Sequence, residues 1–232
     1  MNQIDRYTEY VNWPCEYERL QWLYTTISKQ RKKGKVVRIL EVGCGKGDVA
    51  IPLGLINFSE VKGIDVQEEQ VRIGNERNSL RNVTISYEKL LDCAIYGYDF
   101  IVLTRVMEDA SSYKEVLRYV SEKANPLVEI QLTVTNAGGR FASGTRTRFS
   151  VNRLKKEVLE YGLEVFDVKK VYVFSPMIAR LFPKLPLRRF SRVDHFLAQL
   201  LPNWLVSSHY YRIRKKRSHL KVVRGGGKLL GR

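Results

Sequence analysis

The sequence contains little cysteine, little histidine and no long apolar stretch. Its three cysteines, Cys15, Cys44 and Cys93, are scattered without the close spacing of a metal site or a disulfide framework, so we predict reduced thiols. No His–Cys cluster or paired-carboxylate spacing indicates a metal site. No apolar run reaches the roughly 18 residues that cross a bilayer. Residues 1–8 are polar and lack the layout of a signal peptide, so we expect a cytoplasmic protein.

Acidic residues are almost absent from the last quarter of the chain. Residues 169–232 hold 16 Lys and Arg but a single acid, Asp194, whereas the whole chain of 232 residues has a net charge of +16. The rest of the chain is therefore nearly neutral. This asymmetry indicates an anionic partner: a phosphate-bearing substrate, a membrane surface such as the inner membrane face, or a nucleic acid. A solubilising tail is the alternative, and we expect residues 218–232 to be disordered.

Short apolar runs alternate with helical patterns along most of the chain. The runs are rich in β-branched residues and predict strands at 36–42, 61–66, 83–87, 98–104, 127–134, 163–174 and 207–214. The spacing between them predicts helices at 48–56, 68–80, 111–123 and 150–161. Ser150 is a good N-cap for the last of these helices, and Gly162 is a good C-cap. Strands that alternate with helices predict a parallel sheet with helices on both faces.

Two helical segments flank or interrupt this alternation. Residues 1–34 are aromatic-rich, with Pro14 starting a new helix, and we expect them to form an N-terminal helical lid. Residues 35–217 form the main domain, in which 175–206 is a helical insert that covers the substrate. Apolar residues in the insert recur at helical steps: Val193, Phe196, Leu197, Leu200, Leu201, Trp204 and Leu205. With flanking arginines, this stripe indicates either a cap alone or a cap that also lies on an anionic membrane.

A glycine-rich turn follows the first predicted strand and opens a helix. It reads EVGCGKG over residues 41–47. Glycines there permit a tight turn and let backbone N–H groups approach a ligand. Asp48 stands where a dinucleotide fingerprint requires glycine. Asp65 closes the second strand, where a carboxylate can accept hydrogen bonds from both hydroxyls of a ribose. The pattern therefore predicts a nucleoside ligand.

The stretches 38–53 (RILEVGCGKGDVAIPL) and 63–66 (GIDV) resemble the first two motifs of class I methyltransferases that use S-adenosyl-L-methionine (SAM). The similarity is to the type 11-like group, which acts on small molecules, lipids or glycan precursors. Residues 98–110 and 145–165 resemble later segments of that family. The resemblance implies an α/β, Rossmann-like fold: a seven-stranded, mostly parallel sheet with an antiparallel last strand and a helical insert before it. It implies SAM contacts from Glu41, Gly43, Cys44, Gly45, Gly47, Asp65, Val66, Glu88 and Arg105.

Methyl transfer to a hydroxyl of high pKa needs a base. We name His195, in the insert, as the first candidate, although a structural or surface histidine is the alternative interpretation. Glu108 and Asp109, at the edge of the expected cleft, are the other candidates.

The acceptor class stays open at this stage. The leading hypothesis is a methyltransferase that acts on O, N or C of a small-molecule or lipid-linked acceptor. The alternative is an RNA methyltransferase whose basic C-terminal region binds phosphates. Residues 104–107 lack the Asn/Asp-Pro-Pro-aromatic turn of base-amine methyltransferases, and neither Cys44 nor Cys93 follows a proline. The third hypothesis is a non-catalytic protein with the SAM-binding fold that binds a partner through its basic surface.

Overall fold

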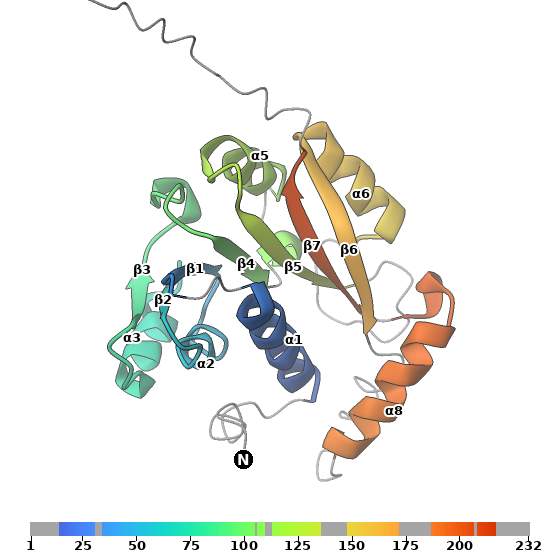
Figure 1. Cartoon of the computed structure of the whole chain (residues 1–232), viewed down its shortest axis with the longest axis horizontal. Helices are drawn as coiled ribbons and strands as arrows, with labels where there is room; N and C mark the ends of the chain where they lie inside the picture. Colours follow the sequence, from blue (N-terminus) through green and yellow to red (C-terminus); the bar gives the residue numbers. More distant parts are fainter. Residues whose placement is uncertain are drawn as a thin grey trace, which may run out of the picture.

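The computed structural model describes residues 14–30, 34–104, 106–109, 113–135, 148–171, 187–206 and 208–216. Its centre is a seven-stranded sheet of order β3-β2-β1-β4-β5-β7-β6 (Figure 1). The strands are β1 (Val37–Val42), β2 (Ser59–Asp65), β3 (Val83–Tyr87), β4 (Phe100–Thr104), β5 (Glu129–Thr135), β6 (Leu163–Val171) and β7 (Ser208–Lys215). β7 runs antiparallel to β5 and β6, and the other pairings are parallel. The predicted α/β fold with its antiparallel last strand is confirmed.

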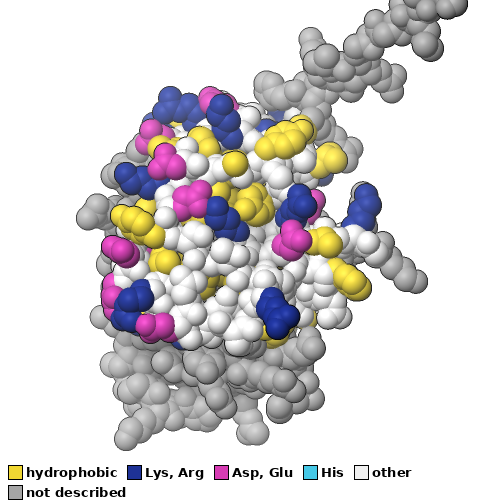
Figure 2. Space-filling view, turned by 90° about the vertical axis from the view of Figure 1, so that its left-hand side faces the viewer, with side chains coloured by type: hydrophobic (Ala, Val, Ile, Leu, Met, Phe, Trp, Pro, Cys, Tyr) yellow, Lys and Arg dark blue, Asp and Glu magenta, His cyan; other side chains and the backbone are white. Residues whose placement is uncertain are grey.

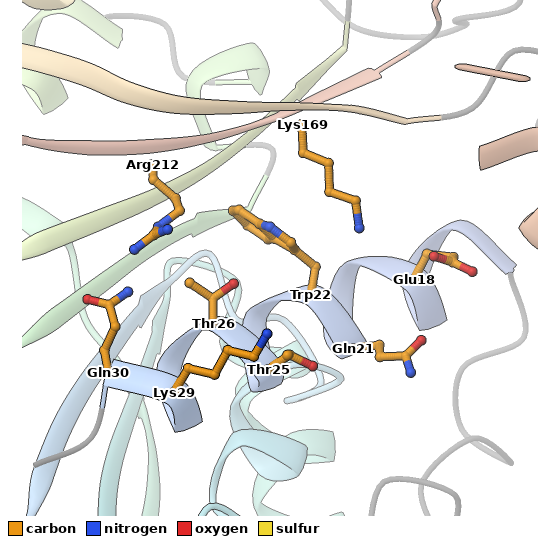
Figure 3. A pocket seen from close by; sticks show the side chains of 9 residues that line it. All are labelled: Glu18, Gln21, Trp22, Thr25, Thr26, Lys29, Gln30, Lys169 and Arg212. Carbon is orange, nitrogen blue, oxygen red and sulfur yellow. The ribbon is translucent and has the colours of Figure 1, made fainter. Parts of the chain in front are cut away.

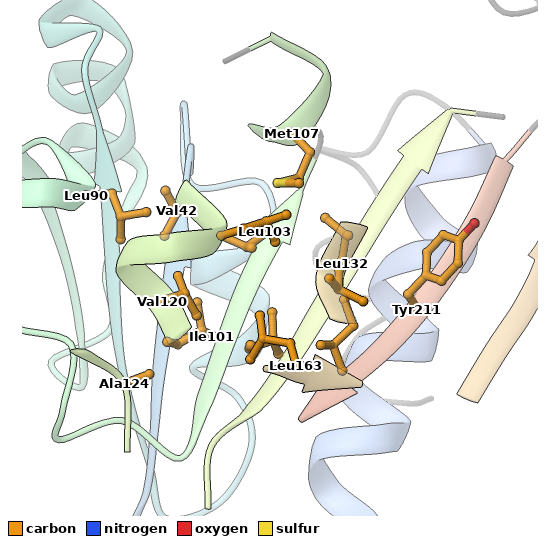
Figure 4. Packing of buried hydrophobic residues seen from close by; sticks show 14 of the residues in the cluster. Val42, Leu90, Ile101, Leu103, Met107, Val120, Ala124, Leu132, Leu163 and Tyr211 are labelled. Carbon is orange, nitrogen blue, oxygen red and sulfur yellow. The ribbon is translucent and has the colours of Figure 1, made fainter. Parts of the chain in front are cut away.

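Helices cover both faces of this sheet, and each face has its own apolar core. The helices are α1 (Pro14–Gln30), α2 (Ala50–Leu53), α3 (Glu68–Arg77), α4 (Val106–Asp109), α5 (Tyr113–Lys123), α6 (Val151–Glu160) and α8 (Leu187–Leu200), with short 3-10 turns η2 (Leu90–Asp92) and η3 (Asn203–Leu205). One core packs α1, α2 and α3 on the sheet. The other packs α4, α5 and α6, where Ile101 and Leu103 of β4 lie under Val120 and Met107 (Figure 4). Burial on both faces explains the continuous apolar run of the central strands.

Local signals set several element boundaries. α1 begins at Pro14, as predicted. Ser150 Oγ accepts a hydrogen bond from Arg153 N at 3.2 Å, and Gly162 adopts a φ of 70° just after α6. The helix predicted over 48–56 was wrong in extent, because α2 has only four residues. The Asp48 carboxylate accepts a hydrogen bond from Arg77 at 2.7 Å, a tertiary contact that holds this residue in the turn before α2.

Helix α1 belongs to the core of the domain. Its Leu20, Leu23 and Ile27 are fully buried against the sheet. Trp22 packs on Tyr210 of β7 with 5.0 Å between ring centroids. The predicted lid includes residues 1–13, which lie outside the described residues, as does the predicted tail at 218–232. The lid therefore stays a prediction for the part of the chain before α1.

His209 is a buried titratable group in β7. Its side chain is fully buried, and neither ring nitrogen has a hydrogen-bond partner among the described residues. Burial, helped by the nearby Lys170 charge, lowers the pKa of His209 to about 4. Protonation therefore favours the unfolded chain, in which a histidine has a pKa of about 6.5. Neutral His209 therefore contributes fully to the free energy of unfolding above pH ~6.5, and this contribution is lost as the pH falls toward 4.

We predict that His209→Gln flattens this pH dependence. Between pH 7 and pH 5 the wild-type chain should lose about 2 kcal/mol more unfolding free energy than the variant, because glutamine does not titrate. Urea unfolding at the two pH values measures the difference, and carboxylates that titrate in both proteins cancel from it. Equal losses in both proteins would show that His209 does not carry a depressed pKa.

Candidate cofactor and active site

The candidate site lies where the order of the sheet reverses. β1 lies between β2 and β4, and the register pairs Val42 with both Ile64 and Leu103. The carboxyl ends of three parallel strands therefore meet at one edge, which is where open α/β sheets bind ligands. A cavity of about 360 Å³ opens there. It is lined by Val42, Gly43, Ile64, Asp65, Val66, Gln67, Glu88, Leu90, Thr104 and Val106.

The loop after β1 is built for close approach to a ligand. Gly43, Gly45 and Gly47 have φ angles of 72°, 52° and 77°, which residues with a side chain rarely adopt. A Cβ on Gly43 would lie 2.9 Å from Val106 Cγ2, in the wall of the cavity. Gly43 N also donates to Ile64 O at 2.8 Å, which ties the start of the loop to the end of β2. The loop therefore needs glycine for its conformation and for the space beside the cavity.

The Asp65 carboxylate joins the loop to the end of β2. Its Oδ2 accepts a hydrogen bond from Gly45 N at 2.8 Å, and its Oδ1 accepts one from Gln67 N at 2.8 Å. The residue is only 8% exposed, yet it lines the cavity. Each carboxylate oxygen can accept a second hydrogen bond. The predicted role of Asp65, to accept the hydroxyls of a ribose, is therefore compatible with its place in the loop.

Val66 and Glu88 line the cavity beside Asp65. Val66 is 59% exposed and offers an apolar surface to a ligand. Glu88 follows β3, where its backbone N donates to Asp65 O at 3.0 Å. Its carboxylate also forms an ion pair with Lys62 Nζ at 2.5 Å. An adenine bound by Glu88 would contact the same carboxylate that pairs with Lys62. The predicted adenine contact of Glu88 stays a prediction.

Glu41 and Cys44 lie behind the loop and do not line the cavity. Both are buried, and Cys44 packs in the core of α1, α2 and α3. Burial raises the pKa of the Glu41 carboxyl well above its usual range, although the Arg19 charge opposes this shift. Burial likewise raises the pKa of the Cys44 thiol, which makes it a poor nucleophile. The structure therefore places these two residues where they support the loop.

The structure brings Gln67, Leu90 and Thr104 into the cavity, and sequence reasoning did not name them. Thr104 ends β4, and Gln67 and Leu90 shortly follow β2 and β3. The signal that could have found them is this position, because the carboxyl ends of parallel strands share one edge. Pattern alone does not show which residue of each turn faces the ligand.

For the candidate bases, the structure describes the position of the backbone only. Glu108 and Asp109 belong to α4, directly after β4 and next to the cavity residue Val106. His195 belongs to α8. The side chains of these three residues and the whole of Arg105 lie outside the described part of the chain. Their predicted roles therefore stay predictions.

A second pocket lies away from the glycine loop, between α1 and the strands β6 and β7. It measures about 410 Å³ and is lined by residues that include Trp22, Lys169 and Arg212 (Figure 3). Burial lowers the pKa of Lys169, whereas Arg212 is held by Glu129 at 2.8 Å. No lining residue is shared with the cavity at the glycine loop. This pocket is therefore separate from the candidate cofactor site.

We predict that Gly43→Ala weakens SAM binding by at least about tenfold, since the added methyl group would displace Val106 from the cavity wall. Gly34→Ala is the matched control. Gly34 also has a positive φ, 78°, but a Cβ there meets nothing within 4 Å. Both variants should lose about 1–2 kcal/mol of stability from backbone strain. Isothermal titration with SAM measures the affinities, and equal losses of affinity in the two variants would contradict this role of Gly43.

We predict that Asp65→Ala lowers SAM affinity by about a hundredfold, since each hydrogen bond to a carboxylate contributes about 1.5–3 kcal/mol. The variant loses the bonds to Gly45 and Gln67 as well as any to the ribose. Glu76→Ala, which removes an exposed acid from α3, controls for the change of net charge. Circular dichroism shows whether each variant is folded. Unchanged SAM affinity in folded Asp65→Ala would exclude Asp65 from the cofactor site.

Comparison with known proteins identifies the family. A family model described as a methyltransferase domain matches residues 16–176. The malonyl-[acyl-carrier protein] O-methyltransferase of Bacillus anthracis is 25% identical over 114 residues, which make up 48% of this chain and 42% of that protein. The match therefore spans less than half the length of that curated relative.

Solved structures share the fold at low sequence identity. One is the O-methyltransferase from a trans-AT PKS multienzyme of Brevibacillus brevis, in complex with S-adenosyl-L-homocysteine (SAH). It superposes with a TM-score of 0.61 at 17% identity, over 86% of this chain and 73% of that one. Magnesium protoporphyrin IX methyltransferase from Synechocystis, with bound SAH, gives 0.58 at 12% identity, over 87% and 82%. The family match shows that the chain belongs to the methyltransferase-domain family, and the solved structures show that it shares their fold.

Proposed function

We propose that the chain is a SAM-dependent methyltransferase that acts on O, N or C of a small-molecule or lipid-linked acceptor. The observation that carries the proposal is the surface of α8. This helix belongs to the insert between β6 and β7, and three of its large apolar side chains, Val193, Phe196 and Leu200, are exposed. An apolar surface suits an acceptor with hydrocarbon parts, whereas RNA is held mainly through its phosphates and stacked bases.

The named relatives support this choice. The curated relative is named for a malonyl-[acyl-carrier protein] acceptor, and one structural neighbour is named for magnesium protoporphyrin IX. Both names describe an organic acceptor, free or attached to a carrier. At these low identities the relatives support only a general class of acceptor for this chain. The experiment below identifies the individual acceptor.

SAM, when bound, supplies a methyl group that is already activated by the positive charge on its sulfur. The protein then has to hold, orient and desolvate the reacting groups. In this chain the loop at Gly43–Gly47 and the Asp65 carboxylate would hold the nucleoside, and Val66 would pack on it. Glu108, Asp109 or His195 would accept the proton of an acceptor hydroxyl. α4 follows β4 directly, which sets the first two close to the cavity.

RNA is the alternative acceptor. The 16 Lys and Arg among residues 169–232 would favour it. Within the described part, however, several cations of this segment have protein partners. Arg212 pairs with Glu129, Arg214 pairs with Glu164, and Lys215 Nζ donates to Ala124 O at 2.7 Å. These partners reduce the charge that is free to hold phosphates, so we favour the organic acceptor.

We expect methyl-labelled SAM to label small or lipid molecules when the protein is incubated with an extract of its source cell. Label should appear in the aqueous small-metabolite fraction or in the organic fraction, and Asp65→Ala should remove it. Mass spectrometry of the labelled fraction then identifies the acceptor. Label confined to RNA, or to amino-acid side chains of proteins and not to a group attached to a carrier protein, would contradict the proposal. Cofactor binding without label in any fraction would favour the hypothesis of a partner-binding protein without catalysis.

A further inference from the structure

Helix α8 presents two different faces. Asp194 and Ala198 are fully buried, whereas Val193, Phe196 and Leu200 are 55%, 63% and 68% exposed. The exposed residues are separated by steps of three and four, so they form one stripe along the helix. Of the apolar stripe predicted from sequence, Leu201 packs against the buried Ala198 and Val206, whereas Val193, Phe196 and Leu200 are exposed. An exposed stripe of large apolar side chains marks an interaction surface.

The stripe is held in place by the body of the domain. α8 packs on β6 and on α1. Gln199 Nε2 donates to Lys170 O at 2.7 Å, and Lys170 Nζ donates to Leu201 O at 2.8 Å. These bonds attach the C-terminal end of the helix to β6. Val193, Phe196 and Leu200 are thus presented outward on a supported helix, which lies at the edge of the molecule in Figure 1.

The segment that carries the stripe is rich in basic residues. Asp194 is the one acidic residue among residues 169–232, and its side chain is fully buried, so this segment exposes no acidic side chain. The sequence of α8 itself contains Arg188, Arg189 and Arg192. The face at β3 and α3, in contrast, carries acidic and basic side chains in a mixed arrangement (Figure 2). Arg189 and Arg192 precede Val193 and Phe196 by four residues each, so they occupy positions on the same side of the helix as the stripe. Apolar and basic positions on one side of a helix match an anionic lipid surface.

The position of α8 relates this surface to the cofactor site. The helix leads through η3 into β7, whose first residue, Ser208, pairs with Thr135 at the carboxyl end of β5. The glycine loop and the cavity lie at the same carboxyl edge of the sheet. A surface that binds α8 would therefore lie on the side of the molecule where the methyl group is transferred.

We propose that α8 docks this methyltransferase on an anionic lipid bilayer, with Val193, Phe196 and Leu200 inserted among the headgroups. The acceptor is then a lipid or lipid-linked molecule at that surface, for example at the inner membrane face. This narrows, and rests on, the proposed function. RNA is the less suitable partner, because bases stack on aromatic rings and only one of the three exposed side chains, Phe196, is aromatic.

The test is sedimentation of the full chain with vesicles of phosphatidylcholine, with and without phosphatidylglycerol. We expect binding to the anionic vesicles and little to the neutral ones. Phe196→Asp should weaken anionic-vesicle binding by at least about tenfold, because it removes a large inserted side chain and adds a repelled charge. Leu127→Asp is the matched control: Leu127 is 86% exposed just before β5, at the opposite edge of the sheet, and its variant should keep most of the binding. SAM affinity should be unchanged in both variants, which shows that they are folded.

Two results would overturn the docking proposal. One is no binding of the wild-type chain to anionic vesicles, whether or not it binds RNA, and the other is equal binding by wild type and Phe196→Asp. The extract experiment separates this failure from failure of the proposed function. Label in a water-soluble metabolite without vesicle binding would refute docking and leave the acceptor class intact. Label on RNA would refute the acceptor class itself.

Discussion

The candidate cofactor site depends on the Asp65 carboxylate, which accepts hydrogen bonds from the backbone N–H groups of Gly45 and Gln67. These two bonds join the loop after β1 to the turn after β2. The parallel register makes this possible, because it aligns Val42 with Ile64 and so brings the two strand ends together. Groups that are held in place before a ligand arrives need little reordering when it binds. One buried acid can thus order the edge at which we propose that a nucleoside binds.

Two separate cores support this edge of the sheet. One packs α1, α2 and α3 on one face, and the other packs α4, α5 and α6 on the opposite face. Glu41 and Cys44 stay buried behind the loop, whereas Val42 and Gly43 line the cavity. Catalysis by positioning requires such a support, because a small displacement of the reacting groups lowers the rate strongly.

The sequence predicted the strands, their order along the chain, the glycine loop and Asp65, since each has a local signal. Strand runs alternate with helical spacing, and the acid closes its strand. The inward orientation of Glu41 and Cys44, and the contribution of Gln67, Leu90 and Thr104 to the cavity, depend on packing between distant segments. The stripe on α8 shows the same limit. Helical spacing found Val193, Phe196 and Leu200, but only contacts with β6 and α1 determine which side of the helix is covered.

The most direct measurement is a crystal structure of the chain with SAH. The account predicts that the ribose hydroxyls lie within about 3 Å of the Asp65 carboxylate oxygens. It also predicts that the loop at Gly43–Gly47 runs alongside the nucleoside and that Gly45 N still donates to Asp65. Two results would contradict the view that the cofactor site is formed before the cofactor binds. One is a ribose bound away from Asp65, and the other is a loop that loses the bond to Asp65 and its positive φ angles when SAH binds.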